Sequence, residues 1–156
     1  MVRIKIYLDV CCLCRPFDDQ LIPRIRKESE AVIAILNRCP QDWELVWSSA
    51  ITYEVAKIVE HERKHYVSSF AAKTTTNIPL DLGIKERAST IMNLGVKALD
   101  ALHIACAERA GAKVLITTDD ALKNIMSHHS DIISLRIVNP AVWYEEVTGN
   151  ESKDTA

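Results

Sequence analysis

The chain has 156 residues, is 48% hydrophobic and carries a formal net charge of −2. This length and composition predict one domain with a substantial core. The small net charge excludes a global basic field, so any nucleic-acid binding must depend on a local patch. No apolar run is long enough to cross a bilayer and Met1 begins no signal-peptide pattern, so we expect a cytoplasmic protein with no membrane association.

The chain contains five cysteines, an odd number, and three of them are crowded at positions 11, 12 and 14. They do not form a disulfide framework, because such frameworks use even numbers of well-spaced cysteines. They also lack the paired Cys or His residues of a zinc finger. We therefore expect reduced, buried thiols, as in proteins of the cytosol.

Hydrophobic periodicity and turn signals divide the chain into alternating strands and helices. In chain order we predict a strand over 4–8, a short helix over 11–13, a polar loop over 17–20, a long helix from 23 to 38, a strand over 45–47, a helix from 50 to 64, a polar turn over 74–77, helices over 84–94 and 98–110, a strand over 114–116, a helix from 120, a strand over 134–138 and a short helix from 140. This alternation predicts an α/β fold, a three-layer α/β/α sandwich with a mainly parallel central sheet. We expect one domain over 1–147 and a flexible polar tail over 148–156.

Acidic residues recur where this fold collects its chemistry. Asp9 and Asp119 each follow a strand, while Glu54 and Asp100 each lie in the first turns of a helix that enters from the same edge of the sheet. Ligands of open α/β sheets bind outside the carboxyl ends of the strands. An acid near a helix N-terminus also interacts favourably with the helix dipole, which is a purely structural explanation. This explanation suits any one of the four residues taken alone, but it is weaker for all four together.

Clustered carboxylates repel one another unless cations neutralise them. Oxygen-only ligand sets select Mg²⁺ or Mn²⁺ rather than zinc. Two such ions can activate water and stabilise the leaving oxygen of a phosphodiester. The acidic positions therefore predict a metal-dependent hydrolytic site.

The ordered set of Leu8-Asp9, Glu54 after Ser49, the segment DALHIA over 100–105, and Thr117-x-Asp119 resembles the PIN domain family over residues 4–145. This resemblance implies a metal-dependent ribonuclease, as in the VapC-like toxins of type II toxin–antitoxin pairs. It assigns metal binding and catalysis to Asp9, Glu54, Asp100 and Asp119, with Thr117 in support. Val10 and Cys11 stand where many members carry Thr or Ser, and then Asn.

The resemblance also implies a mechanism and partners. Mg²⁺ or Mn²⁺ held by Asp9, Asp100 and Asp119 activates water for in-line attack on RNA. Glu54 binds a second ion or orients the water, and the products carry 5′-phosphate and 3′-hydroxyl ends. The expected partners are an RNA substrate, a cognate antitoxin protein and a second copy of the chain in a homodimer.

Two other functions compete with this interpretation. One is a catalytically idle PIN-like module that only binds RNA or protein. The other is a zinc hydrolase, because residues 61–65 spell HExxH on a predicted helix. The middle of that motif is Arg-Lys, where a buried protease helix would carry apolar residues, so we interpret the segment as a solvated helix face.

Several other residues have a structural and a functional interpretation. His103 lies one turn after Asp100, and is either part of the site or a buried histidine with satisfied hydrogen bonds. We expect Asp120 to cap the helix that follows it. Four basic residues near the first acid face RNA, an acidic partner or water, with water favoured: Arg15, Arg24, Arg26 and Lys27. The three tryptophans at 43, 47 and 143 are expected in the core or in an interface.

Overall fold

The computed structural model describes residues 3–155, with side chains up to residue 151. Within that range the centre of the fold is one sheet whose strands are all parallel, in the order β3-β2-β1-β4-β5. The strands are Lys5–Leu8 (β1), Glu44–Ser48 (β2), Thr74–Ile78 (β3), Val114–Ile116 (β4) and Arg136–Val138 (β5). The expected three-layer α/β/α sandwich with a parallel sheet is confirmed.

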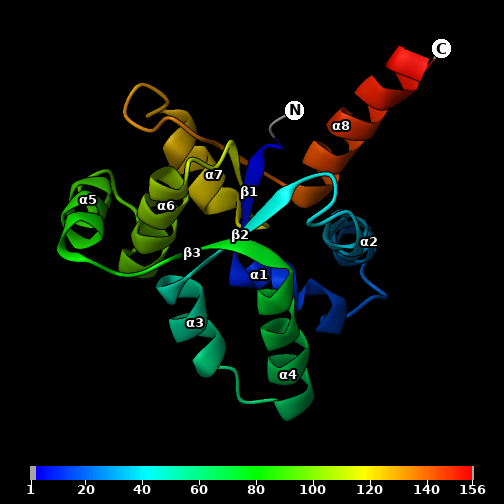
Figure 1. Cartoon of the computed structure of the whole chain (residues 1–156), viewed down its shortest axis with the longest axis horizontal. Coiled ribbons are helices and arrows are strands. Elements are labelled where there is room, and N and C mark those ends of the chain that lie inside the picture. Colours follow the sequence, from blue (N-terminus) through cyan, green and yellow to red (C-terminus); the bar gives the residue numbers. More distant parts are fainter. Residues whose placement is uncertain (1–2, 156) are drawn as a thin grey trace.

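The helices cover both faces of this sheet. They are Val10–Cys14 (α1), Pro23–Asn37 (α2), Ser49–Ala56 (α3), His61–Ser69 (α4), Leu82–Met92 (α5), Ala98–Ala110 (α6), Asp120–Ser127 (α7) and Pro140–Thr155 (α8), with 3₁₀ turns at Arg15–Phe17 and Phe70–Lys73. Figure 1 shows α5, α6 and α7 on one side of the sheet, α2 and α8 on the other, and α3 and α4 projecting beyond its lower edge. None of the helices within 3–155 has both the length and the apolar character of a membrane span.

The central strands are formed by apolar residues that are covered from both faces, as in parallel sheets generally. All three residues of β4 are buried, and so are the last three of β1. The two strands lie side by side in register, with Leu8 opposite Ile116. Gly111 ends α6 with a left-handed φ of 77°, which a side chain would strain, and so turns the chain directly into β4.

The strand order creates a topological switch point between β1 and β4. From β1 the chain moves outward through β2 to β3, then returns across the sheet to β4 and continues to β5. The connections on the two sides of the β1–β4 boundary therefore leave in opposite directions, which opens a crevice at the carboxyl ends of these two strands. The residues that follow β1 and β4 consequently line the position where such folds bind ligands.

The sequence prediction missed the edge strand β3. Residues 74–77 were predicted as a polar turn, but Thr74–Ile78 pairs in parallel with β2. The segment is polar because an edge strand is half exposed, and its three threonines are β-branched residues that suit a strand. Its pairing partner lies far away in the sequence, so local periodicity gives no signal for it.

Two helix predictions were also wrong in length. The helix predicted from 50 to 64 is interrupted between Ala56 and His61, giving the separate helices α3 and α4. The last helix, α8, is long rather than short and continues to Thr155, through residues expected to be a tail. An ion pair of 2.5 Å joins Glu151 of α8 to Arg38 at the end of α2, which anchors this polar continuation to the body of the protein.

The core contains the residues that the apolar pattern selected. All three tryptophans are buried, and Trp43 and Trp143 meet edge to face with ring centroids 4.7 Å apart. All five cysteines lie in the described part of the chain and are free thiols. Cys12, Cys39 and Cys106 are buried as expected, but Cys11 is exposed, because it lies on the outward side of the short helix α1.

We predict that Leu115→Ala lowers the free energy of unfolding by about 3 kcal/mol, because Leu115 is 1% exposed at the centre of the sheet. Urea denaturation of the purified protein measures this change. Leu82→Ala is the matched control: Leu82 is 71% exposed, and we expect a change below about 0.5 kcal/mol. Equal effects of the two substitutions would contradict the assignment of β4 to the core.

Candidate metal centre

Asp9 connects the central strand β1 to helix α1. Its backbone N–H donates to the carbonyl of Ile116 at 3.2 Å, which extends the β1–β4 pairing by one residue. Its side chain is the N-cap of α1 and accepts a hydrogen bond from the N–H of Cys12 at 3.0 Å. The carboxylate is buried, with 6% of the residue exposed.

Asp119 occupies the equivalent position after β4. It is the N-cap of α7 and accepts a hydrogen bond from the N–H of Leu122 at 3.1 Å. The hydroxyl of Thr117, which is fully buried, accepts from the N–H of Asp119 at 3.1 Å. The side chain of Thr117 also lowers the pKa of Asp9, so this one residue influences both strand-end acids. The capping role expected for Asp120 thus belongs to Asp119.

Glu54 and Asp100 approach from two helices. Glu54 lies on α3, which begins directly after β2 and is capped by Ser48. Asp100 lies in the first turn of α6, the helix that leads back to β4. Both residues are partly buried, and Oε1 of Glu54 lies 3.2 Å from Nε2 of His103, one turn along α6 from Asp100.

The four carboxylates share one electrostatic neighbourhood. The thiol of Cys11 lies in the field of all four, since Asp9, burial, Glu54, Asp100 and Asp119 together raise its pKa. The pKa of Asp100 is raised by burial first, then by Asp119 and more weakly by Glu54. The structure therefore brings residues that are up to 110 positions apart in sequence to one rim of the sheet, at the switch point between β1 and β4.

The pKa of Asp9 is strongly perturbed. Burial raises its pKa from an ordinary value near 3.8 to about 6, and Glu54 adds to the shift. The Thr117 hydrogen bond, the N–H of Cys12 and the nearby His103 oppose it. A buried carboxylate with partial hydrogen-bond compensation and acidic neighbours is a site that a cation stabilises.

The donor set fits a hard divalent cation, because it offers carboxylate and hydroxyl oxygens, while the buried base beside it, His103, is directed toward Glu54 and Tyr7. The side chains are not drawn together around a single point: among the described residues, no three His, Cys, Asp or Glu side chains form a group that could hold one ion. One oxygen each of Asp9, Glu54 and Asp119 is held by a hydrogen bond, so each keeps another oxygen for a ligand.

A network of buried charge supports the loop that carries Asp119. Its centre is Glu28 of α2, which is 1% exposed and accepts hydrogen bonds from Arg15, Arg24 and Asn139. The guanidinium of Arg24 also forms a two-pronged ion pair with Asp120, at 2.7 and 2.9 Å, and holds the pKa of that carboxyl at about 2.

Two interpretations of the basic residues change as a result. We favoured water as the surroundings of the basic residues, but Arg15 and Arg24 form ion pairs within this network. The sequence analysis did not identify Glu28, although its position four residues after Arg24 on one helix is a recognised ion-pair spacing. It also missed Tyr7 and Ser48, whose hydroxyls hydrogen-bond each other at 2.7 Å behind the acidic rim.

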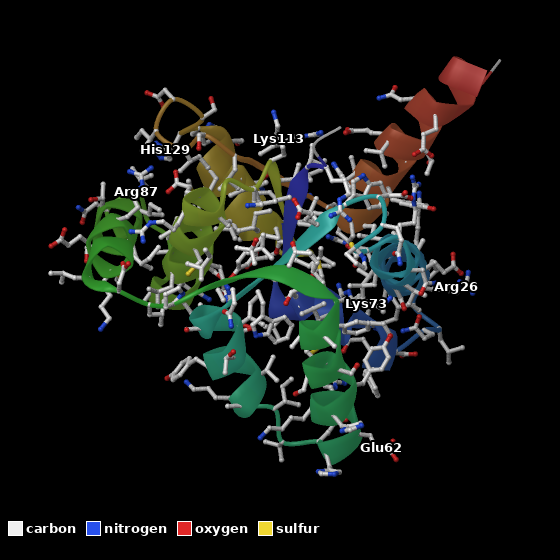
Figure 2. The ribbon with its side chains drawn as sticks, in the orientation of Figure 1. Arg26, Glu62, Lys73, Arg87, Lys113 and His129 are labelled. Atoms are coloured by element: carbon white, nitrogen blue, oxygen red, sulfur yellow. The ribbon has the colours of Figure 1, made fainter. Side chains whose placement is uncertain are left out.

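The HExxH segment forms the start of α4. His61, Glu62 and His65 are all exposed, and Figure 2 shows Glu62 at the outer tip of this helix, away from the sheet. Arg63 instead turns inward and donates a hydrogen bond to the carbonyl of Phe17. The arrangement is that of a solvated helix face, as the Arg-Lys centre of the motif suggested.

We predict that, in buffer without divalent cations, Asp9→Asn raises the free energy of unfolding at pH 8 by about 3 kcal/mol at most. The raised pKa of Asp9 means that its ionised form is disfavoured in the folded state, so the native acid destabilises the fold above pH 6. This difference shrinks as pH falls from 6 to 4, because the native side chain then becomes protonated. Asparagine keeps the capping acceptor.

Urea denaturation at pH 4, 6 and 8 measures this pH dependence. Asp131→Asn, at an exposed position after α7, is the control, and we expect it to leave the free energy of unfolding unchanged at all three pH values. A loss of stability in Asp9→Asn at pH 8 would show that the ionised carboxylate is favoured by its surroundings.

Comparisons with known proteins agree with this architecture. No curated protein matches the sequence. Among solved structures, a chain of VapBC2 from Rickettsia felis, bound to a DNA fragment of its promoter, superposes with a TM-score of 0.58 at 16% identity, covering 87% of this chain and 98% of that chain. A chain of VapBC-1 from nontypeable Haemophilus influenzae gives 0.55 at 14% identity, covering 88% and 98%. The PIN domain profile matches residues 6–126, most of the chain, and the protein therefore belongs to the PIN domain family.

Proposed function

We propose that this protein is a metal-dependent endoribonuclease that hydrolyses RNA phosphodiester bonds, and that it is the toxin of a type II toxin–antitoxin pair. The observation that carries the proposal is the common field of Asp9, Glu54, Asp100 and Asp119 at the switch point of the sheet. Membership of a family of nucleases supports hydrolysis of a nucleic acid. The fold shared with chains of two VapBC structures supports the toxin assignment.

Each acid has a role that follows from its surroundings. Asp9 and Asp119 have fixed backbones as helix N-caps at adjacent strands, so they and Asp100 are the residues that would hold Mg²⁺ or Mn²⁺. A bound cation supplies Lewis acidity toward water and the phosphodiester. Thr117 fixes the Asp9 carboxylate, and Glu54 binds a second cation or orients the attacking water.

The cellular setting is also part of the proposal. The partners are an RNA substrate, a cognate antitoxin that covers the acidic rim, and a second copy of this chain in a homodimer, all in the cytoplasm. An acidic rim repels the RNA backbone until cations neutralise it, so substrate binding and cation binding should depend on each other. We interpret the exposed HExxH segment as no part of this chemistry.

We predict that Asp9→Asn abolishes RNA cleavage, with a loss larger than the roughly 100-fold effect that removal of a ligand's supporting partner produces. The assay incubates purified protein with mixed RNAs in Mg²⁺ or Mn²⁺, with and without a chelator. Asp131→Asn serves as the control and should cleave like the wild type. Cleavage that persists in chelator, or an Asp9→Asn variant that is folded and fully active, would refute the metal-centre mechanism.

We predict that expression of the wild-type chain arrests growth of a bacterial host, whereas equal expression of Asp9→Asn does not. The reason is that RNA cleavage, rather than binding, depends on the Asp9 carboxylate. Growth curves with immunoblots of protein level measure the difference. Arrest by both proteins to the same degree would favour the idle module that acts by binding RNA or protein.

A further inference from the structure

A chain of hydrogen bonds runs through the core behind the acidic rim. Tyr7 of β1 is fully buried, and its hydroxyl lies 2.7 Å from Oγ of Ser48 and 2.6 Å from Nδ1 of His103. The opposite ring nitrogen of His103, Nε2, lies 3.2 Å from Oε1 of Glu54. We call these four residues, Ser48, Tyr7, His103 and Glu54, the relay.

The relay has one consistent direction when Glu54 is ionised and the His103 ring carries a single proton. An ionised carboxylate only accepts hydrogen bonds, so Nε2 of His103 must carry the proton that lies between them. In a neutral imidazole Nδ1 is then an acceptor, which requires the Tyr7 hydroxyl to donate to it. Ser48 in turn donates to Tyr7, while its oxygen accepts from the N–H of Ile51 as the cap of α3.

This direction satisfies every polar atom of the buried part of the relay. Tyr7 and His103 are 0% and 2% exposed, so an unmatched donor or acceptor there would be costly. The two rings also meet edge to face, with centroids 5.6 Å apart, which fixes the plane of the imidazole. His103 therefore presents Nε2 to Glu54 in one orientation.

Glu54 needs such an anchor more than Asp9 and Asp119 do. Asp9 and Asp119 are short side chains held by backbone N–H groups of their own helices. Glu54 has a longer side chain, 25% of which is exposed, and its carboxylate hydrogen-bonds His103. Without that bond the carboxylate would sample several rotamers.

We propose that His103 is a positioning residue for Glu54: oriented by Tyr7, it holds one carboxylate oxygen and directs the other into the acidic rim. His103 itself contacts neither cation nor RNA in this arrangement. The inference depends on the proposed function for its catalytic consequence, but the orientation of the relay can be measured without any activity. An ordinary buried histidine would fill the same space without affecting Glu54 in particular.

The first test measures the relay directly. Proton–nitrogen correlation spectra of ¹⁵N-histidine protein at pH 8 report which ring nitrogen of His103 carries a proton. We expect a protonated Nε2, and a shift of the Nδ1 resonance in Tyr7→Phe, which removes the hydroxyl that donates to it. Tyr144→Phe, which removes a hydroxyl from helix α8, is the control. A His103 whose Nε2 carries no proton would overturn the proposal.

The second test asks whether His103 acts through Glu54. His103→Gln should weaken Mn²⁺ binding, measured by calorimetry, and lower kcat for RNA cleavage, each by about 10- to 100-fold. In the Glu54→Ala background the same substitution should change both by less than about threefold. His129→Gln is the control, since Figure 2 places His129 beyond α7, on the other side of the molecule from α3.

The outcomes separate the two proposals. Equal losses from His103→Gln in both backgrounds would assign His103 to packing and refute the positioning role. If the wild type cleaves no RNA, the proposed function fails, and the nitrogen spectra with the Mn²⁺ affinities still decide the relay. If His103→Gln does not fold, Tyr7→Phe takes its place in the same comparison, with a loss confined to the Glu54-containing protein as the expected result.

Discussion

The burial of the Asp9 carboxylate is the constraint around which this site is organised. A charge in this position is disfavoured by loss of water, and Glu54 adds to the penalty. The fold compensates with the N–H of Cys12 and the hydroxyl of Thr117. These bonds hold the carboxylate in place but do not remove the excess negative charge, and a divalent cation is the natural complement to what remains.

The sheet topology explains why the penalty arises at this point. Strands β1 and β4 meet at the switch point and are followed by Asp9 and Asp119, at the edge of the sheet where such folds bind ligands. Glu28 and its arginines brace the far side of the Asp119 loop, so that the acid cluster is surrounded by fixed groups. The groups around the site are thus held by stabilising contacts, whereas the burial of acids within the site lowers the stability of the fold.

The sequence predicted the features that local pattern encodes. The positions of Asp9, Asp100 and Asp119 relative to strands and helices follow from periodicity and caps. Glu54 was expected in the first turns of its helix but lies in the last turn of α3, because that helix ends at Ala56. Strand β3 was not predictable in this way, because its polar residues become a strand only by pairing with β2. Glu28 and Asn139 are 111 residues apart, and Tyr7 and His103 are 96 apart, so neither contact leaves a trace in local spacing.

The four acids differ in how firmly they are held, and this difference bears on how a cation site forms. Asp9 and Asp119 are fixed by capping bonds and Glu54 by His103. Asp100 is half-buried in the first turn of α6, and no side-chain hydrogen bond joins its carboxylate to another described residue. Burial raises the pKa of Asp100, and Asp119 and Glu54 add to this shift, so a cation bound among these residues would favour the ionised carboxylate and complete the site.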